Sequence, residues 1–147
     1  MEVLEVEAVA AMTAEQVIHH SLTGGVLTRT GNRCDAAAPQ GIYRAAGNDE
    51  WIALTVRHTR DWEELCRVIP REDWRHDSSL ADLATRHARH DEIDRVLSTW
   101  IGGRSASDAE RELVAAGIPA ARVLETDAFY PDPHLVARRH FRDLDHE

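Results

Sequence analysis

The sequence predicts a small α/β domain of the α+β type, with a β-hairpin and short strands packed by several helices and preceded by a long helix. Two patterns support this prediction. Residues 42–56 contain two short strand-like runs on either side of turn residues, as in a hairpin, and the second run alternates between two faces. Further along the chain, apolar side chains recur at helical spacing, and Gly or Pro residues end the helices.

The first predicted element is a helix over residues 2–22, which contain no Gly or Pro. Its apolar side chains fall on two faces: Val3, Val6, Ala10 and Val17 on one, and Leu4, Ala8, Ala11 and Ile18 on the other. A helix that is apolar on two sides is expected to be buried on two sides. Gly24-Gly25 is expected to end the helix. We therefore expect residues 1–24 to pack on another domain or a partner chain.

A loop over residues 25–41 leads from this helix into the hairpin. Its segment from Cys34 to Gln40 contains no large apolar side chain. Ile42–Ala45 is the first predicted strand, and Gly47-Asn48-Asp49 supplies the turn. The second strand is Trp51–Val56. There Ile52, Leu54 and Val56 are predicted to share one face, and Trp51, Ala53 and Thr55 the other.

The rest of the domain, within residues 42–147, is predicted to be mainly helical. Thr59 can cap a helix that ends before Pro70, and Ser78 or Ser79 can cap the next one. A third helix carries the stripe Ile93, Val96, Leu97, Trp100 and Ile101. Its acidic start, Asp91, Glu92 and Asp94, favours the helix dipole.

The C-terminal part of the domain adds a capping box and three short elements. Ser107 is predicted to cap a helix with Glu110, and Gly117 ends that helix. The segment "IPAARVL" predicts a short strand. Residues 125–130 predict a short helix, and Pro133 is expected to start a last helical turn.

The composition excludes several classes of function. The net charge of -9 argues against nucleic acid and anionic membranes as partners, because both attract basic surfaces. All 17 basic residues are arginine, so no lysine Schiff base can form within the chain. The acidic residues near Met1 are unlike a secretory signal, and no apolar run reaches the ~20 residues of a membrane span. We expect a cytoplasmic protein with unpaired thiols.

The best candidate metal ligands are His87, His90 and Asp91, which helical spacing brings to neighbouring positions. The opposing interpretation is a solvated helix face, because Arg86 and Arg89 lie between and beside these residues. A metal site usually needs a further ligand from another element of the fold. The nearby arginine cations also disfavour the binding of a metal ion. We therefore predict a solvated face and no metal site.

The two cysteines are the candidate nucleophiles. Cys34 has Asp35 beside it, whose negative charge would disfavour a thiolate, so we interpret Cys34 as an incidental loop residue. Cys66 lies on the apolar stripe of its helix and is predicted to belong to the core. The segment "GGRSAS" lacks the lysine of a phosphate-binding loop. The residue chemistry alone supports no complete catalytic set.

The order of short motifs along the chain is more specific than any one of them. "RTGN" leads into "AAPQGIYRAAGNDEWIALTV", and then come "DWEELCRVI", "DEID", "LVAAGIPAARV" and "DPHLVAR". From about Val3 to Asp145 this order resembles the family III CoA-transferases, the group that includes formyl-CoA transferase, the carnitine and bile-acid CoA-transferases, and α-methylacyl-CoA racemase. The resemblance implies the C-terminal small-domain portion of a longer, interlocked dimeric enzyme.

The resemblance implies no catalytic residue in this chain. The family's catalytic aspartate and most of its CoA-binding residues lie in a large domain, and Asp35, Asp49 and Asp91 do not match that aspartate's motif. Coenzyme A thioester is then the substrate, held through the missing large domain, and no covalent cofactor is expected. The implied partner is a second copy of the chain or a large-domain polypeptide.

The resemblance also assigns a role to the loop before the hairpin. In the formyl-CoA transferases the matching loop is glycine-rich and moves over the catalytic aspartate. The residues of this chain that would form such a lid are Arg29, Gly31, Asn32, Ala36, Ala37, Ala38, Pro39, Gln40 and Gly41. The glycine run is absent, which argues against formyl-type chemistry. A plain surface connection is the alternative.

Three functions stay open at this point. The first is the small domain of a family III acyl-CoA transferase, inactive by itself. The second is a non-catalytic assembly module that docks on a separate large-domain subunit, which the two-sided first helix suggests. The third is part of an α-methylacyl-CoA racemase-type enzyme.

Overall fold

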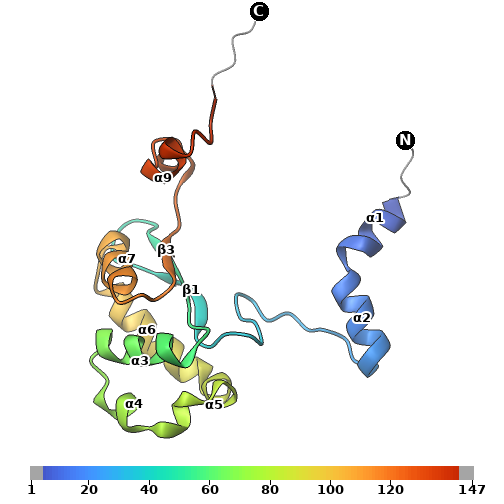
Figure 1. Cartoon of the computed structure of the whole chain (residues 1–147), viewed down its shortest axis with the longest axis horizontal. Helices are drawn as coiled ribbons and strands as arrows, with labels where there is room; N and C mark the ends of the chain where they lie inside the picture. Colours follow the sequence, from blue (N-terminus) through green and yellow to red (C-terminus); the bar gives the residue numbers. More distant parts are fainter. Residues whose placement is uncertain (1–4, 143–147) are drawn as a thin grey trace, which may run out of the picture. The chain divides into compact units, whose positions relative to one another are not determined.

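The computed structural model describes residues 5–142 of the chain. The chain divides into two compact units, Met1–Gly31 and Asn32–Glu147, and each is described by itself (Figure 1). Among the described residues, no helix has the length and apolar character needed to cross a membrane.

The first unit contains two helices, α1 (Glu5–Met12) and α2 (Ala14–Thr23), in place of the single helix predicted over residues 2–22. The prediction of one unbroken helix is wrong at Thr13. The hydroxyl of Thr13 donates to the carbonyl oxygen of Val9 at 2.9 Å, an acceptor that the Thr13 backbone N–H also uses. This local competition between a threonine hydroxyl and the backbone interrupts the helix.

The end of α2 follows the prediction, because Gly24 adopts a left-handed conformation with φ 71°. The apolar side chains of this unit are exposed, with Met12 at 86% and Leu22 at 79%. Val3 and Leu4, which the two-sided pattern included, lie outside the described residues.

The second unit is built on a three-stranded antiparallel sheet in the order β1-β2-β3. The strands are β1 (Gln40–Arg44), β2 (Trp51–Thr55) and β3 (Ala120–Arg122). The predicted hairpin is confirmed, and so is its turn, where Gly47 has φ 117° and Asp49 has φ 57°. β1 begins at Gln40 and not at the predicted Ile42, because Gln40 and Gly41 also pair with β2.

Within residues 32–142, eight helical segments complete this unit (Figure 1): α3 (Thr59–Val68), α4 (Glu72–His76), the 3₁₀ segment η1 (Ser78–Ala81), α5 (Leu83–Ala88), α6 (His90–Gly102), α7 (Ala106–Ala115), α8 (Thr126–Phe129) and α9 (Pro133–Ala137). α6 packs along β1, while α7 contacts β2, β3 and α3. The sheet, α3, α4, η1, α6 and α7 contribute side chains to one core, to which no residue of α8 or α9 belongs.

The core follows the predicted periodicities. Ile52, Leu54 and Val56 are buried, whereas the alternate residues of β2 are only half-buried. The predicted apolar stripes of α3 and α6 also face inward: Trp62, Leu65, Cys66, Ile69, Ile93, Leu97, Trp100 and Ile101 are all buried. Burial of these side chains is the main favourable contribution to folding.

Three of the predicted helix caps are wrong, and the residues that cap instead use carboxylates or an earlier serine. α3 follows His58, whose backbone N–H donates to Asp61, so Thr59 is already helical. Asp77 caps η1 and Asp82 caps α5, in place of Ser78 or Ser79. A charged oxygen is the stronger acceptor for the unpaired N–H groups at a helix start.

The cap of α7 is Ser105, not Ser107. The Ser105 hydroxyl accepts the backbone N–H of Asp108 at 3.1 Å and donates to the Asp108 carboxylate at 2.7 Å. Glu110, which was expected to complete the capping box, instead binds Arg122 at 2.8 Å. This ion pair joins α7 to β3.

Arg86 is the most unusual residue of the core, and the prediction that it lies on a solvated face is wrong. Its side chain is 1% exposed. Its Nε donates to the carbonyl oxygen of Ala38 at 2.6 Å. Its Nη1 donates to the carbonyl oxygens of Leu80 at 2.8 Å and Ala81 at 2.9 Å. Three backbone acceptors from two separate segments thus pair with the Nε and Nη1 donors of one buried cation.

We expect Arg86→Met to lower the free energy of unfolding by about 3 kcal/mol or more, because each buried acceptor left unpaired costs about 1–3 kcal/mol. Chemical denaturation monitored by tryptophan fluorescence measures this loss. The matched control is Arg67→Met at an exposed position of α3, which should leave stability unchanged. Equal stability of the two variants would contradict the role assigned to Arg86.

Candidate functional site: a loop anchored at one end

The residues predicted to form a lid fall into two groups. Arg29 and Gly31 belong to the first unit, where both are exposed and Gly31 has φ 65°. Asn32 and Ala36 belong to the second unit and are also exposed. The remaining residues are anchored: Ala37, Ala38 and Pro39 are buried, and Gln40 and Gly41 are half-buried within β1.

The anchored half of the loop continues the sheet. The N–H of Ala38 donates to the carbonyl oxygen of Val56 at 3.1 Å, and the N–H of Val56 donates to that of Pro39 at 2.9 Å. Arg86 then holds the Ala38 carbonyl from the opposite element. By contrast, none of the backbone N–H groups from Asn32 to Ala36 donates to a backbone oxygen among the described residues. Ala37 therefore divides the loop into an exposed outer half and a fixed inner half.

One side chain of the outer half holds it against α6. Nη2 of Arg33 donates to Asp91 at 2.6 Å and also to Asp94. The second oxygen of Asp94 accepts the hydroxyl of Tyr43 at 2.6 Å. Burial and the carboxylate together raise the pKa of Tyr43, so the phenol stays protonated and keeps donating.

Sequence reasoning missed this ionic cluster of Arg33, Tyr43, Asp91 and Asp94. The acidic start of α6 was explained by the helix dipole alone. Asp91 and Asp94 are three residues apart and therefore share a face, and a loop arginine lay within the region singled out. That spacing was the available signal, but it does not say which of the many arginines comes close.

His90 lies beneath the ionic cluster and is 2% exposed, so its assignment to a solvated face is also wrong. The backbone N–H of Gln40 donates to its Nε2 at 3.1 Å, which places the proton of the neutral ring on Nδ1. Nδ1 is buried without a hydrogen-bond partner among the described residues. Burial lowers the pKa of His90. The negative charge of Asp94 partly opposes this decrease, and the positive charge of Arg33 lowers the pKa further.

The three candidate metal ligands are engaged separately. His87 Nε2 lies 3.1 Å from the carbonyl oxygen of Asp35, His90 binds Gln40, and Asp91 binds Arg33. The described part of the chain contains no group of three or more His, Cys, Asp or Glu side chains that could hold a metal ion.

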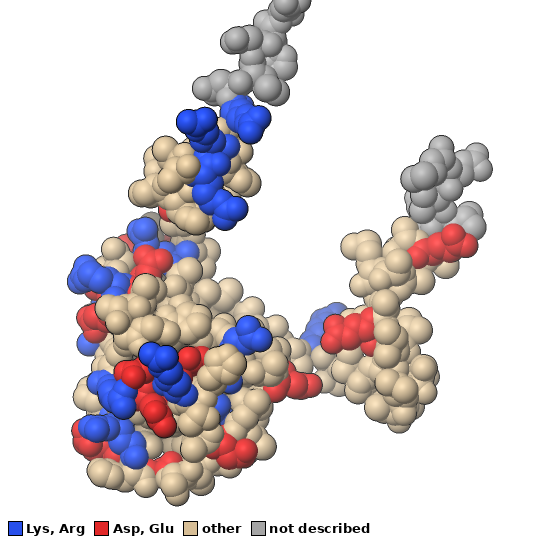
Figure 2. All heavy atoms as spheres, in the orientation of Figure 1, with Lys and Arg blue, Asp and Glu red and all other residues tan. Residues whose placement is uncertain are grey.

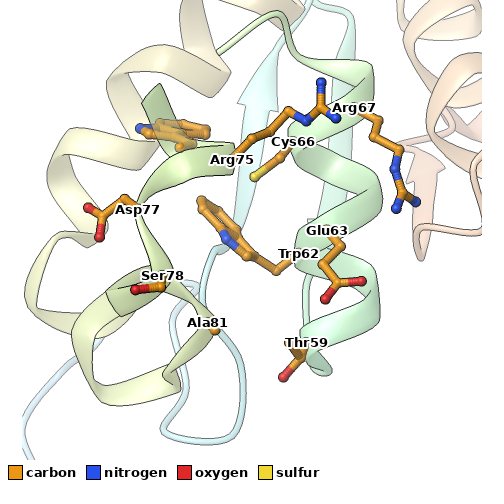
Figure 3. Close-up of a pocket in the computed structure, with 10 residues that line it drawn as sticks. Thr59, Trp62, Glu63, Cys66, Arg67, Arg75, Asp77, Ser78 and Ala81 are labelled. Carbon is orange, nitrogen blue, oxygen red and sulfur yellow. The ribbon is translucent and has the colours of Figure 1, made fainter. Parts of the chain in front are cut away.

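A separate hollow of about 440 Å³ lies between α3 and the α4–η1 segment (Figure 3). Trp62 and Trp74 meet on its wall with ring centroids 5.2 Å apart. Cys66 points into this region from α3, but it is 3% exposed. Burial raises the pKa of its thiol to about 12, which removes it as a nucleophile at neutral pH.

Charges of both signs are interleaved over the rest of the second unit. On the face in Figure 2, arginine and acidic side chains alternate across the helical part of this unit, and several form ion pairs. Arg89, for example, binds Asp77 at 2.6 Å and Glu92 at 2.9 Å. Such pairs are worth little individually at a surface.

These features define an α+β domain that presents a partly anchored loop. The model of CoA-transferase family III matches residues 1–147. The chain therefore belongs to CoA-transferase family III.

The chain spans only part of the length of the known members that it matches. A probable CoA-transferase of Mycobacterium tuberculosis is 29% identical over 71% of the chain, which spans 13% of that protein. The succinyl-CoA–D-citramalate CoA-transferase of Chloroflexus aurantiacus is 25% identical over 90% of the chain, and the chain spans 33% of it. The succinyl-CoA:mesaconate CoA-transferase of Haloarcula hispanica is 26% identical over 95% of the chain.

Solved structures support the fold. The crystal structure of Rv3272 from M. tuberculosis has a TM-score of 0.71 and 19% identity, covering 92% of this chain and 34% of that one. A CAIB/BAIF family protein from Brucella suis has a TM-score of 0.64 and 18% identity over 88% of this chain. At this identity the likeness concerns the fold alone.

The buried position of Cys66 makes the two thiols easy to tell apart. We expect Ellman's reagent near pH 8 to modify exposed Cys34 quickly and Cys66 only as the protein unfolds, since the Cys66 thiol stays protonated and covered. A Cys34→Ser variant should show no fast phase. Fast labelling of Cys66 in the folded chain would contradict this packing.

His90 gives a pH prediction. Its pKa should lie below the ordinary 6.5, so the unfolded chain takes up a proton first and stability falls as the pH drops through 6.5. Removal of the nearby charge in Arg33→Gln should raise the pKa of His90. NMR titration of the ring protons measures both values. A pKa above 6.5 in the wild-type chain, or no rise in the variant, would contradict the assigned environment.

Proposed function

We propose that the chain is the small-domain portion of a family III acyl-CoA transferase, which moves coenzyme A from an acyl-CoA thioester to a free carboxylic acid. One observation carries the proposal: the family matches the whole chain, yet the chain spans about a third of most of the relatives compared. The missing portion would supply the catalytic aspartate and most contacts to coenzyme A.

Within such an enzyme, the loop Arg29–Gly41 would act as the lid over the reacting thioester. Its outer half is exposed and has small side chains around Ala36, so backbone N–H groups could approach a substrate oxygen and stabilise developing negative charge. Its inner half is fixed to β2 and Arg86. Movement of the lid would then be confined to residues before Ala37.

The acyl groups we propose are dicarboxylic. The names of several relatives pair succinyl-CoA with citramalate, mesaconate or malate as the second acid. The absent glycine run at Cys34–Ala38 also argues against formyl transfer. These names favour a transferase over the racemase-type alternative.

A second candidate, an assembly module that docks on a separate large-domain subunit, is favoured by a different observation. α1 and α2 expose Val6 at 81%, Met12 at 86% and Leu22 at 79%. Exposed apolar side chains in such number indicate a surface that another polypeptide covers. A monomeric chain at high concentration, with this helical unit well packed, would contradict that need for a partner.

The proposed function predicts that the 147-residue chain alone transfers no coenzyme A from succinyl-CoA to mesaconate. Combined with the large-domain polypeptide from its own genome, it should support transfer, measured by chromatography of the two thioesters. Turnover by the isolated chain would show that a nucleophile lies within it. An assembled protein without activity on a panel of dicarboxylic acyl-CoA donors would contradict the transferase proposal.

A further inference from the structure

The guanidinium of Arg33 is held in an unusual way. Both of its ion pairs use the same nitrogen, Nη2, which donates to Asp91 and Asp94. Its Nε and Nη1 donate to no acceptor among residues 5–142. The side chain is 37% exposed. The two bidentate edges of a guanidinium, Nε–Nη2 and Nη1–Nη2, both include Nη2, so each aspartate takes only one of the two donors of an edge. A carboxylate in the place of one aspartate could bind both donors of that edge.

The two carboxylates on Arg33 are not equivalent. Asp94 is 24% exposed and is fixed from its other side by Tyr43. Asp91 is 84% exposed, and its carboxylate binds no side chain other than Arg33 in the described part of the chain. Asp94 therefore orients Arg33, whereas Asp91 is held weakly, as exposed ion pairs are.

From these contacts we propose that Arg33 recognises the free carboxylate of a dicarboxylic substrate, with Asp91 occupying the place of that carboxylate until substrate arrives. The inference rests on the proposed function. A dicarboxylic acid joined to coenzyme A through one end keeps an anion at the other. That anion needs a cation close to the thioester, and Arg33 lies in the outer half of the loop proposed to cover it.

Replacement of the Asp91 carboxylate by a substrate carboxylate has little electrostatic cost. Arg33, Asp91 and Asp94 together carry one net negative charge, so a third carboxylate added to this set would be repelled. When substrate displaces Asp91, the number of charges around Arg33 is unchanged, and Asp91 returns to solvent where it is already exposed. Asp94 and Tyr43 keep the guanidinium in place during the exchange.

This exchange predicts effects of opposite sign at the two aspartates. Asp91→Asn removes the competitor and should strengthen succinate binding about three-fold, the scale of an exposed ion pair. Asp94→Asn lets the guanidinium move and should weaken binding. Arg33→Gln should abolish it. If the three residues formed only a structural salt bridge, removal of the Asp91 charge would not be expected to strengthen succinate binding.

The test is a titration of the 147-residue chain with succinate at constant ionic strength, following the NMR shift of the Arg33 Nε–H. The matched control variant is Arg67→Gln, whose arginine binds a single carboxylate, Glu64, on the exposed side of α3. The control ligand is succinamide, which has the same length and no charge. Thermal unfolding of each variant verifies the fold.

The proposal stands if succinate shifts Arg33, succinamide does not, Asp91→Asn binds more tightly than wild type, and Arg67→Gln behaves as wild type. It fails if neither wild type nor Asp91→Asn responds, if Arg33→Gln binds equally well, or if inorganic phosphate produces the same response as succinate. This binding assay is independent of turnover. A transferase whose KM for the dicarboxylic acid is unaffected by Arg33→Gln would overturn the inference and leave the proposed function intact.

Discussion

Burial of the Arg86 charge is the constraint on which the arrangement of the second unit depends. A guanidinium in the core is costly unless its donors find acceptors, and here three carbonyl oxygens accept hydrogen bonds from Nε and Nη1. Those carbonyls belong to Ala38, before β1, and to Leu80 and Ala81 in η1. Since Trp62 of α3 also lies 5.6 Å from this cation, one side chain fixes the entrance of the hairpin against two helical segments.

The same constraint shapes the loop that could reach a substrate. The strand-like pairing of Ala38 and Pro39 with Val56 and the Arg86 contact keep the inner half in place. On the N-terminal side of Ala37, the loop is held by side-chain contacts, chiefly those of Arg33 with Asp91 and Asp94. Closure of the proposed lid would then cost the ordering of few residues.

The sequence was sufficient for features that depend on local patterns. Alternation in β2, the stripes of α3 and α6, and the glycine at the end of α2 all appear as expected, because backbone geometry and burial impose them directly. Caps were less predictable, since Asp77 and Asp82 compete with neighbouring serines for the same N–H groups. The burial of Arg86 and His90 was missed, because charged and polar residue types are usually exposed. Their partners, Ala38 and Gln40, lie far away in the sequence.

The central claim is that Ala37 divides the loop into a fixed half and a free half. Amide hydrogen exchange across the loop tests this claim most directly. The account predicts that the amides of Ala38 and Val56 are as protected as those of the core strand β2. The amides of Asp35 and Ala36 should exchange almost as fast as in an unstructured peptide. Equal protection along residues 32–40, or fast exchange at Ala38, would contradict the division and the lid that is built on it.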